Sequence, residues 1–220
     1  MAKIELIYFS CHGRVFVIRT LLELSGIEFE DTRLEWRSEK FASQKDEFPL
    51  GQLPVLKVDG VSFSQTKAII AFCLKQTTFK KLKGVESLKA DMVYESIEEA
   101  WMKMLKPGYV AKAAVDQDDL TEQGRVFYKA VKAGAVEAFI QIEKILKYAH
   151  VTDMVIGGKR SVADLMLLNL WIFVDDPRVN VHGYFKENCP TGVKVVERLM
   201  QDPKIEEIVA KARQVRFLPY

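Results

Sequence analysis

The chain has 220 residues, of which 49% are hydrophobic and 28% charged, and its formal net charge is +2 at pH 7. This composition indicates a globular protein with enough residues for one large or two small domains. Basic and acidic residues are interspersed, so nothing in the charge pattern indicates binding to nucleic acid. The three cysteines stand far apart, without zinc-site or disulfide spacing, and no run of about 18 apolar residues predicts a membrane span. We therefore expect a cytoplasmic protein with no metal and no membrane segment.

The first part of the chain, residues 1–78, alternates between strand-like and helix-like patterns. Residues 3–9 alternate in a β-prone manner and predict a first strand. Residues 15–24 carry apolar side chains at helical spacing and predict an amphipathic helix. Residues 27–33 predict a second strand, and residues 36–45 a short polar helix or an irregular segment.

A hairpin follows, and a polar helix start comes directly after it. Pro54 precedes a short apolar strand, which suits a residue that cannot donate a hydrogen bond to a sheet. Asp59-Gly60 is a two-residue hairpin turn between this strand and the next. Gln65-Thr66 then begins an apolar helical run, and the free N–H groups of such a helix start favour an anion. The order βαβ-α-ββα predicts a thioredoxin-like domain around a mixed four-stranded sheet.

The remainder of the chain, residues 86–220, is helical throughout and follows a polar, basic linker over residues 77–85. Helices are expected over residues 86–115, 120–148, 161–174, 193–200 and 204–213. Pro107-Gly108 is a point where the first of these helices is open to disturbance. The nearly all-apolar helix 161–174 should lie in the centre of this domain. Residues 215–220 are expected to form a loose tail.

The start of the central helix carries a capping box. Ser161 places a hydroxyl at the N-cap and Asp164 a carboxylate three residues later. Each side chain then satisfies a backbone N–H group of the first turn. The predicted role is structural.

Two sets of residues resemble the cytosolic glutathione transferases, and together they span the chain. Gln52-Leu53-Pro54-Val55, Asp59-Gly60 and Gln65-Thr66-Lys67-Ala68-Ile69 resemble the half that binds glutathione. The box at Ser161–Asp164 resembles the Ser/Thr-x-x-Asp box of the family's helical domain. The resemblance implies a thioredoxin-like domain over 1–78 that binds glutathione and an all-α domain over 86–220 that shapes the electrophile pocket. It also implies that Pro54 is cis.

The resemblance is greatest to the sigma class and assigns catalysis to Tyr8. In the family, a tyrosine at this place donates a hydrogen bond to the glutathione sulfur and favours the thiolate, which then attacks small hydrophobic electrophiles. A free thiol has a pKa of about 8.5, and lowering it by about two units requires about 2.7 kcal/mol. One or two hydrogen bonds to a charged group supply free energy on this scale.

The remaining site residues are carried over from the family. The glutathione-binding residues are predicted to be Arg14, Trp36, Lys40, Gln52, Leu53, Pro54, Gln65, Thr66 and Glu99. The electrophile pocket is predicted to be lined by Phe9, Trp101, Met104, Leu105 and Tyr109. Glu99 would reach glutathione from the neighbouring subunit of a homodimer, and Leu50 would insert into the neighbour's helical domain. Glutathione is the expected co-substrate, with no metal.

Several residues depart from the family pattern and leave two alternatives open. Cys11 lies in the turn where omega-type members carry a cysteine, which allows a thiol transferase, with His12 as a less favoured general base. The Cys11-His12 pair, Thr66 in place of serine and Glu99 in place of aspartate also allow a non-catalytic, crystallin-like or ligand-carrying relative. The Cys-x-x-Trp of the prostaglandin D synthases is replaced by residues 103–106, so that isomerase activity is not expected. The sequence does not name the electrophile.

Overall fold

The computed structural model describes residues 2–36, 38–77, 79, 82–116 and 119–218. The described residues form two compact units. The first contains residues 2–79 together with residues 207–218, and the second contains residues 82–206. Each unit is described by itself below. Among the described residues, no helix has both the length and the apolar character needed to cross a membrane.

The first unit is built on a mixed four-stranded sheet, as predicted. Its strands are β1 (Ile4–Phe9), β2 (Glu30–Leu34), β3 (Val55–Val58) and β4 (Val61–Ser64). Their order is β2-β1-β3-β4, with β2 parallel to β1 and the other two pairs antiparallel. β2 begins at Glu30 rather than at Ile27, because the backbone N–H of Ile27 donates to Leu22 O and closes the preceding helix.

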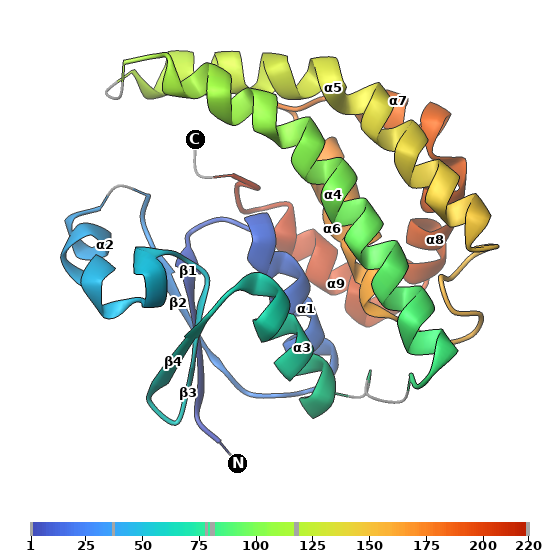
Figure 1. The fold of residues 1–220 in the computed structure, drawn as a ribbon, viewed down its shortest axis with the longest axis horizontal. Coiled ribbons are helices and arrows are strands. Elements are labelled where there is room, and N and C mark those ends of the chain that lie inside the picture. Colours follow the sequence, from blue (N-terminus) through green and yellow to red (C-terminus); the bar gives the residue numbers. More distant parts are fainter. Residues whose placement is uncertain (1, 37, 78, 80–81, 117–118, 219–220) are drawn as a thin grey trace. The chain divides into compact units, whose positions relative to one another are not determined.

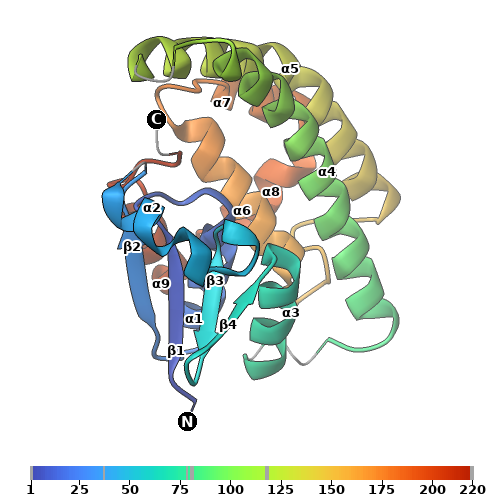
Figure 2. The same cartoon turned by 60° about the vertical axis from the view of Figure 1, so that its left-hand side comes forward.

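Three helices complete this part of the unit: α1 (Phe16–Leu24), α2 (Glu39–Gln44) and α3 (Thr66–Gln76). α1 and α3 lie side by side on one face of the sheet (Figures 1 and 2). A separate apolar cluster of Ile7, Leu34, Phe48 and Val55 receives Phe41 of α2. The end of β1 therefore lies in packed surroundings, which fixes the turn that follows it.

The second unit is helical, as predicted. Its helices are α4 (Val85–Ala113), α5 (Leu120–Tyr148), α6 (Val162–Asp175), α7 (His182–Asn188) and α8 (Pro190–Leu199), and α9 (Pro203–Ala212) runs from this unit into the first. α4 continues through Pro107 rather than breaking there. A Cβ on Gly108 would come within 2.7 Å of the Phe127 ring, so this glycine allows α5 to pack closely against α4. The short helix α7 was not expected from the sequence.

The capping box at the start of α6 is present. The Ser161 side chain accepts from the backbone N–H of Asp164, and the Asp164 carboxylate accepts from the backbone N–H of Ser161 at 2.7 Å. The same carboxylate also accepts from the backbone N–H of Val155 at 2.8 Å, so it ties the preceding loop to the helix. Both box residues are fully buried.

The prediction of a loose tail from residue 215 is wrong for the described residues 215–218. Phe217 is 2% exposed and Leu218 5% exposed. The backbone N–H of His12 donates to Arg216 O at 3.2 Å, and that of Gly13 donates to Phe217 O at 2.8 Å. The tail is ordered by pairing with residues about two hundred positions earlier, which sequence periodicity cannot reveal.

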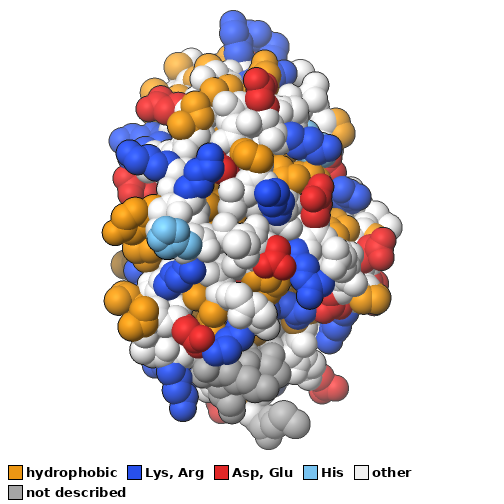
Figure 3. Space-filling model, turned by 90° about the vertical axis from the view of Figure 1, so that its right-hand side faces the viewer, with side chains coloured by type: hydrophobic (Ala, Val, Ile, Leu, Met, Phe, Trp, Pro, Cys, Tyr) orange, Lys and Arg blue, Asp and Glu red, His pale blue; other side chains and the backbone are white. Residues whose placement is uncertain are grey.

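Figure 3 shows one face of the molecule, on which basic and acidic side chains are interspersed with hydrophobic ones. This distribution agrees with the sequence, in which charges of both signs alternate along the chain. No extended basic stripe of the kind that binds nucleic acid crosses this face.

Candidate functional site

A cavity of about 290 Å³ in the first unit brings together residues from three separate segments. It is lined by Arg14, Leu50, Gln52, Leu53, Pro54, Ser64, Gln65 and Thr66. Six of these residues belong to the predicted glutathione site: Arg14, Gln52, Leu53, Pro54, Gln65 and Thr66. Arg14 follows the turn after β1, whereas the other five come from the loop before β3 and the start of α3, and the fold places these segments around one space.

The backbone of the loop before β3 leaves the sheet's ladder at this cavity. The Leu53–Pro54 peptide bond is cis, as the resemblance implied. The paired register of β1 and β3 ends at Val55, so Leu53 lies beyond the sheet's ladder, at the cavity. An extended peptide can pair with such a backbone edge through main-chain hydrogen bonds.

The start of α3 closes the other side of the cavity with a backbone in an unusual conformation. Gln65, the N-cap of α3, has φ 75° and ψ 109°, in the region that residues other than glycine rarely adopt. Such a conformation costs about 1–3 kcal/mol and is found mostly at functional sites. Thr66 is the first residue of the helix, where backbone N–H groups and the helix dipole favour an anion.

Tyr8 precedes the cavity residue Arg14 by six positions and contacts the turn that leads to it. It is buried near the end of β1, and its hydroxyl lies against Gly13, where an added Cβ would stand 2.8 Å from Tyr8 Oη. Gly13 has φ +43°, and the next residue, Arg14, lines the cavity. The turn between β1 and α1 therefore contacts the Tyr8 hydroxyl through Gly13, and Arg14, which comes next, lines the cavity.

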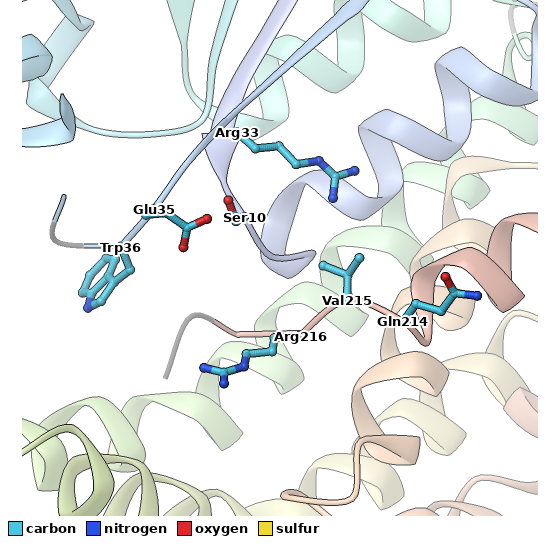
Figure 4. A pocket seen from close by; sticks show the side chains of 7 residues that line it. All are labelled: Ser10, Arg33, Glu35, Trp36, Gln214, Val215 and Arg216. Atoms are coloured by element: carbon cyan, nitrogen blue, oxygen red, sulfur yellow. The ribbon is translucent and has the colours of Figure 1, made fainter.

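Two further predicted glutathione-binding residues lie away from this cavity. Trp36 lines a second cavity, of about 510 Å³, and its ring meets that of Phe9 edge-on at 4.8 Å. Figure 4 shows the residues of this second cavity, which come from the ends of β1 and β2 and from the C-terminal segment: Ser10, Arg33, Glu35, Trp36, Gln214, Val215 and Arg216. Lys40 is exposed on α2 and lines neither cavity. The roles of Trp36 and Lys40 toward glutathione stay predictions.

Lys45 is a basic residue that the sequence reasoning missed. Its Cγ and Cε lie 3.3 Å from the position of a Cβ on Gly51. Gly51 stands between Leu50 and Gln52, which both line the first cavity. The signal that could have found it is a lysine four positions before the loop Pro49-Leu50-Gly51, rather than the Trp-x-x-x-Lys spacing that indicated Lys40.

The predicted residues of the second unit all lie on α4. Glu99 is 62% exposed in its side chain and pairs with Lys103 at 2.7 Å. Trp101, Met104 and Leu105 are buried, and the Trp101 ring packs against that of Phe173 at 6.0 Å between centroids. Tyr109 is 36% exposed and packs against Phe127. Their role as an electrophile pocket stays a prediction.

Cys11 and His12 both face inward. Cys11 is fully buried, and its carbonyl accepts from Arg19 Nη1 at 2.7 Å. His12 is 4% exposed, its Nε2–H donates to Ala212 O at 2.8 Å, and burial lowers its pKa to about 4. A cysteine that attacks a disulfide must be accessible and in the thiolate form, so burial of Cys11 argues against the thiol-transferase alternative.

Comparison with known proteins decides the family. Residues 4–74 match the family described as "Glutathione S-transferase, N-terminal domain". Glutathione S-transferase P 10 of Caenorhabditis elegans is 30% identical over 216 residues, which cover 97% of this chain and 93% of that relative. The chain belongs to the glutathione S-transferase family. The family assignment confirms the prediction of a glutathione transferase.

Two further members of the glutathione S-transferase family extend the comparison over nearly the whole chain. Glutathione S-transferase 3 of Caenorhabditis elegans is 27% identical and covers 99% of this chain, which spans 100% of that relative. A monomeric glutathione S-transferase from the hookworm Necator americanus has the same fold, with a TM-score of 0.69, 25% identity and coverage of 95% and 97% of the two chains. These names do not distinguish a sigma-like subclass.

Proposed function

We propose that this glutathione transferase joins the sulfur of glutathione to small hydrophobic electrophiles, with the thiolate stabilised by the hydroxyl of Tyr8. The observation that carries the proposal is the cavity that unites the cis-Pro54 loop, the start of α3 and Arg14. Arg14 directly follows the glycine against which the Tyr8 hydroxyl lies. A peptide anion bound in the cavity would therefore have this hydroxyl near its central residue.

Two features of the cavity match two parts of glutathione, and a lysine near the cavity is a candidate for the third part. The α3 N-terminus, with Gln65 and Thr66, favours the γ-glutamyl carboxylate. The backbone of Leu53 lies beyond the sheet ladder and offers main-chain hydrogen bonds to the cysteinyl part. A basic side chain is needed for the glycyl carboxylate, and Lys45 beside Gly51 is a second candidate next to Lys40.

Tyr8 acts by lowering the pKa of the bound thiol. A phenol with a pKa of about 10 stays protonated near neutral pH and donates to the sulfur. Lowering the thiol pKa from about 8.5 to about 6.5 raises the thiolate fraction at pH 7 from about 3% to about 75%. With an aryl halide, the new sulfur–carbon bond forms as the carbon–halogen bond breaks. The halide then leaves with the electron pair, and the thiol proton goes to solvent.

The proposal extends to the kind of glutathione transferase: a sigma-like, cytoplasmic homodimer that detoxifies electrophiles. Leu50 supports the dimer, since its side chain is 70% exposed and its backbone has φ 61°. An apolar side chain held outward in this way suits insertion into a second copy of the chain. Glu99 would supply the partner's carboxylate for the glutamyl amine, while Trp101, Met104, Leu105, Tyr109 and Phe9 would line the electrophile pocket.

The test combines a glutathione-binding titration with a turnover assay on a generic aryl halide. We expect saturable binding together with turnover. Binding without turnover would favour the non-catalytic, ligand-carrying alternative, and absence of both would contradict the site. Lys45→Met and Lys40→Met form a matched pair in the binding titration. The lysine that holds the glycyl carboxylate is the one whose loss weakens glutathione binding more.

A further inference from the structure

The β1–α1 turn (Ser10–Gly13) is held at both ends by residues outside the glutathione cavity. At its start, the backbone N–H of Ser10 donates to Leu34 O at 2.9 Å. The carbonyl of Cys11 accepts from Arg19, whose guanidinium also pairs with Asp31 at 3.0 Å. The first half of the turn is thus fixed by β2 and by α1.

The second half of the turn is held by the C-terminal clasp, the segment Ala212–Phe217. Three hydrogen bonds join them: His12 N–H to Arg216 O, Gly13 N–H to Phe217 O, and His12 Nε2–H to Ala212 O. The clasp is anchored in turn by Phe217, which is 2% exposed. Because burial lowers the pKa of His12 to about 4, its imidazole is neutral, and its Nε2–H joins the turn to the end of α9.

We propose that the C-terminal clasp is a positioning element for the Tyr8 hydroxyl. Gly13 has φ +43° and lies directly under Tyr8 Oη. Glycine reaches several backbone regions at similar free energy, so the hydrogen bond from Gly13 to Phe217 selects the conformation that places this surface under the hydroxyl. The inference rests on the proposed role of Tyr8 and adds the chain segment on which that role depends.

The effect of the clasp on catalysis follows from the geometry of hydrogen bonds. A donor–acceptor pair weakens steeply once the distance or angle leaves its narrow optimum. If the Gly13 peptide rotates after loss of its acceptor, the hydroxyl above it loses its fixed position relative to the bound sulfur. The thiolate is then less favoured, while the start of α3 and the Leu53 backbone still bind glutathione.

The experiment measures the pKa of the glutathione thiol in the binary complex, from the ultraviolet absorbance of the thiolate. One variant ends at Gln214 and so loses both backbone acceptors of the clasp. A second, His12→Leu, keeps the clasp and loses only the side-chain bond to Ala212. His12→Gln, whose amide nitrogen reaches a place similar to Nε2, is the conservative variant. Lys211→Ala, an exposed neighbour that pairs with Glu207, is the control.

We expect the truncated chain to raise the thiol pKa by about one unit, which lowers conjugation at neutral pH by about tenfold. Glutathione affinity should fall much less than conjugation in the same variant, because seven of the eight residues that line the cavity lie outside the turn and only Arg14 adjoins it. His12→Leu should show a smaller rise, and His12→Gln and Lys211→Ala none. Because burial keeps the pKa of His12 at about 4, a titration above pH 6 reports the thiol and not the imidazole.

Tyr8→Phe separates this inference from the proposed function. If Tyr8→Phe raises the thiol pKa and truncation of the clasp does not, the clasp has no positioning role and the function stands. If Tyr8→Phe leaves the pKa unchanged, the proposed function itself fails. In the Tyr8→Phe background, truncation should cause no further rise, and an additive rise would show that the clasp acts elsewhere. Should the truncated chain fail to fold, His12→Leu against His12→Gln gives the same decision.

Discussion

The capping box of α6 gives a prediction whose magnitude follows from its contacts. The Asp164 carboxylate accepts hydrogen bonds from Ser161 N at 2.7 Å, Ser161 Oγ at 2.6 Å and Val155 N at 2.8 Å. Asp164→Ala leaves these donors buried and unsatisfied, at about 1–3 kcal/mol for each. Burial also raises the pKa of this carboxyl, so its removal recovers part of that loss. We therefore expect a net loss of about 3–5 kcal/mol in the free energy of unfolding.

Ser161→Ala should cost less, because it removes only the N-cap hydroxyl. Its hydrogen bond from Asp164 N is long, at 3.4 Å, and loss of an N-cap typically costs about 0.5–2 kcal/mol. Thr152→Ala, an exposed hydroxyl in the preceding loop, is the matched control and should be neutral. Urea unfolding followed by circular dichroism gives the three values, and a glutathione titration without urea gives the affinity.

Glutathione affinity should stay at the wild-type value in all three variants, since the box belongs to the second unit and the cavity to the first. A variant of the box that kept full stability but lost glutathione affinity would refute the reasoning. The reasoning would also be refuted if Ser161→Ala lowered the free energy of unfolding more than Asp164→Ala does.

Three shorter predictions accompany this one. Sedimentation should show a dimer at micromolar concentration, which Leu50→Glu should dissociate; a wild-type monomer would contradict both the dimer and the role of Glu99. The pKa of His12 is lowered to about 4 by burial, so the unfolded chain binds a proton that the folded chain does not between pH 6.5 and 4. The free energy of unfolding should fall by about 3 kcal/mol over this window as the pH is lowered, and His12→Gln should remove this part of the pH dependence in acid titrations of stability. Cys11→Ala should be nearly silent in conjugation of an aryl halide, since the attacking sulfur belongs to glutathione; loss of mixed-disulfide reduction in this variant would instead indicate a thiol transferase.

The fold could be predicted wherever the determining signal is local. The alternation of residues 3–9 and the Asp59-Gly60 turn define their strands within a few positions. The helix at 120–148 coincides with α5, because its apolar residues recur at helical spacing over its full length. The short helix α7 carries no such repeat, and His182-Gly183 at its start gives no capping signal.

The ordered tail could not be predicted, since its burial depends on contacts from the opposite end of the sequence. Arg216 and Phe217 have no periodic neighbours, and their order comes from hydrogen bonds to His12 and Gly13. The same long-range dependence explains why Lys45 was missed. Its relation to the cavity is set by the packing of its aliphatic chain over Gly51, which spacing alone does not reveal.

In the predicted site, too, residues that are close in sequence can be placed together from the sequence, whereas distant ones cannot. Gln52, Leu53, Pro54, Gln65 and Thr66 follow one another through a hairpin and into a helix, so local structure alone brings them together around the cavity. Only Arg14 joins this group from a distant segment. The predicted residues on α4 belong to the second unit, and none of them lines this cavity.

Stabilisation of the bound thiolate by the hydroxyl of Tyr8 can be tested directly by one titration. The ultraviolet absorbance of the thiolate is followed against pH for glutathione bound to the wild-type protein and to Tyr8→Phe. If the hydroxyl stabilises the thiolate, Tyr8→Phe raises the thiol pKa by about one unit or more, reduces conjugation at neutral pH at least about tenfold per unit and leaves glutathione affinity little changed. An unchanged thiol pKa in Tyr8→Phe, beside an inactive Cys11→Ala, would contradict it.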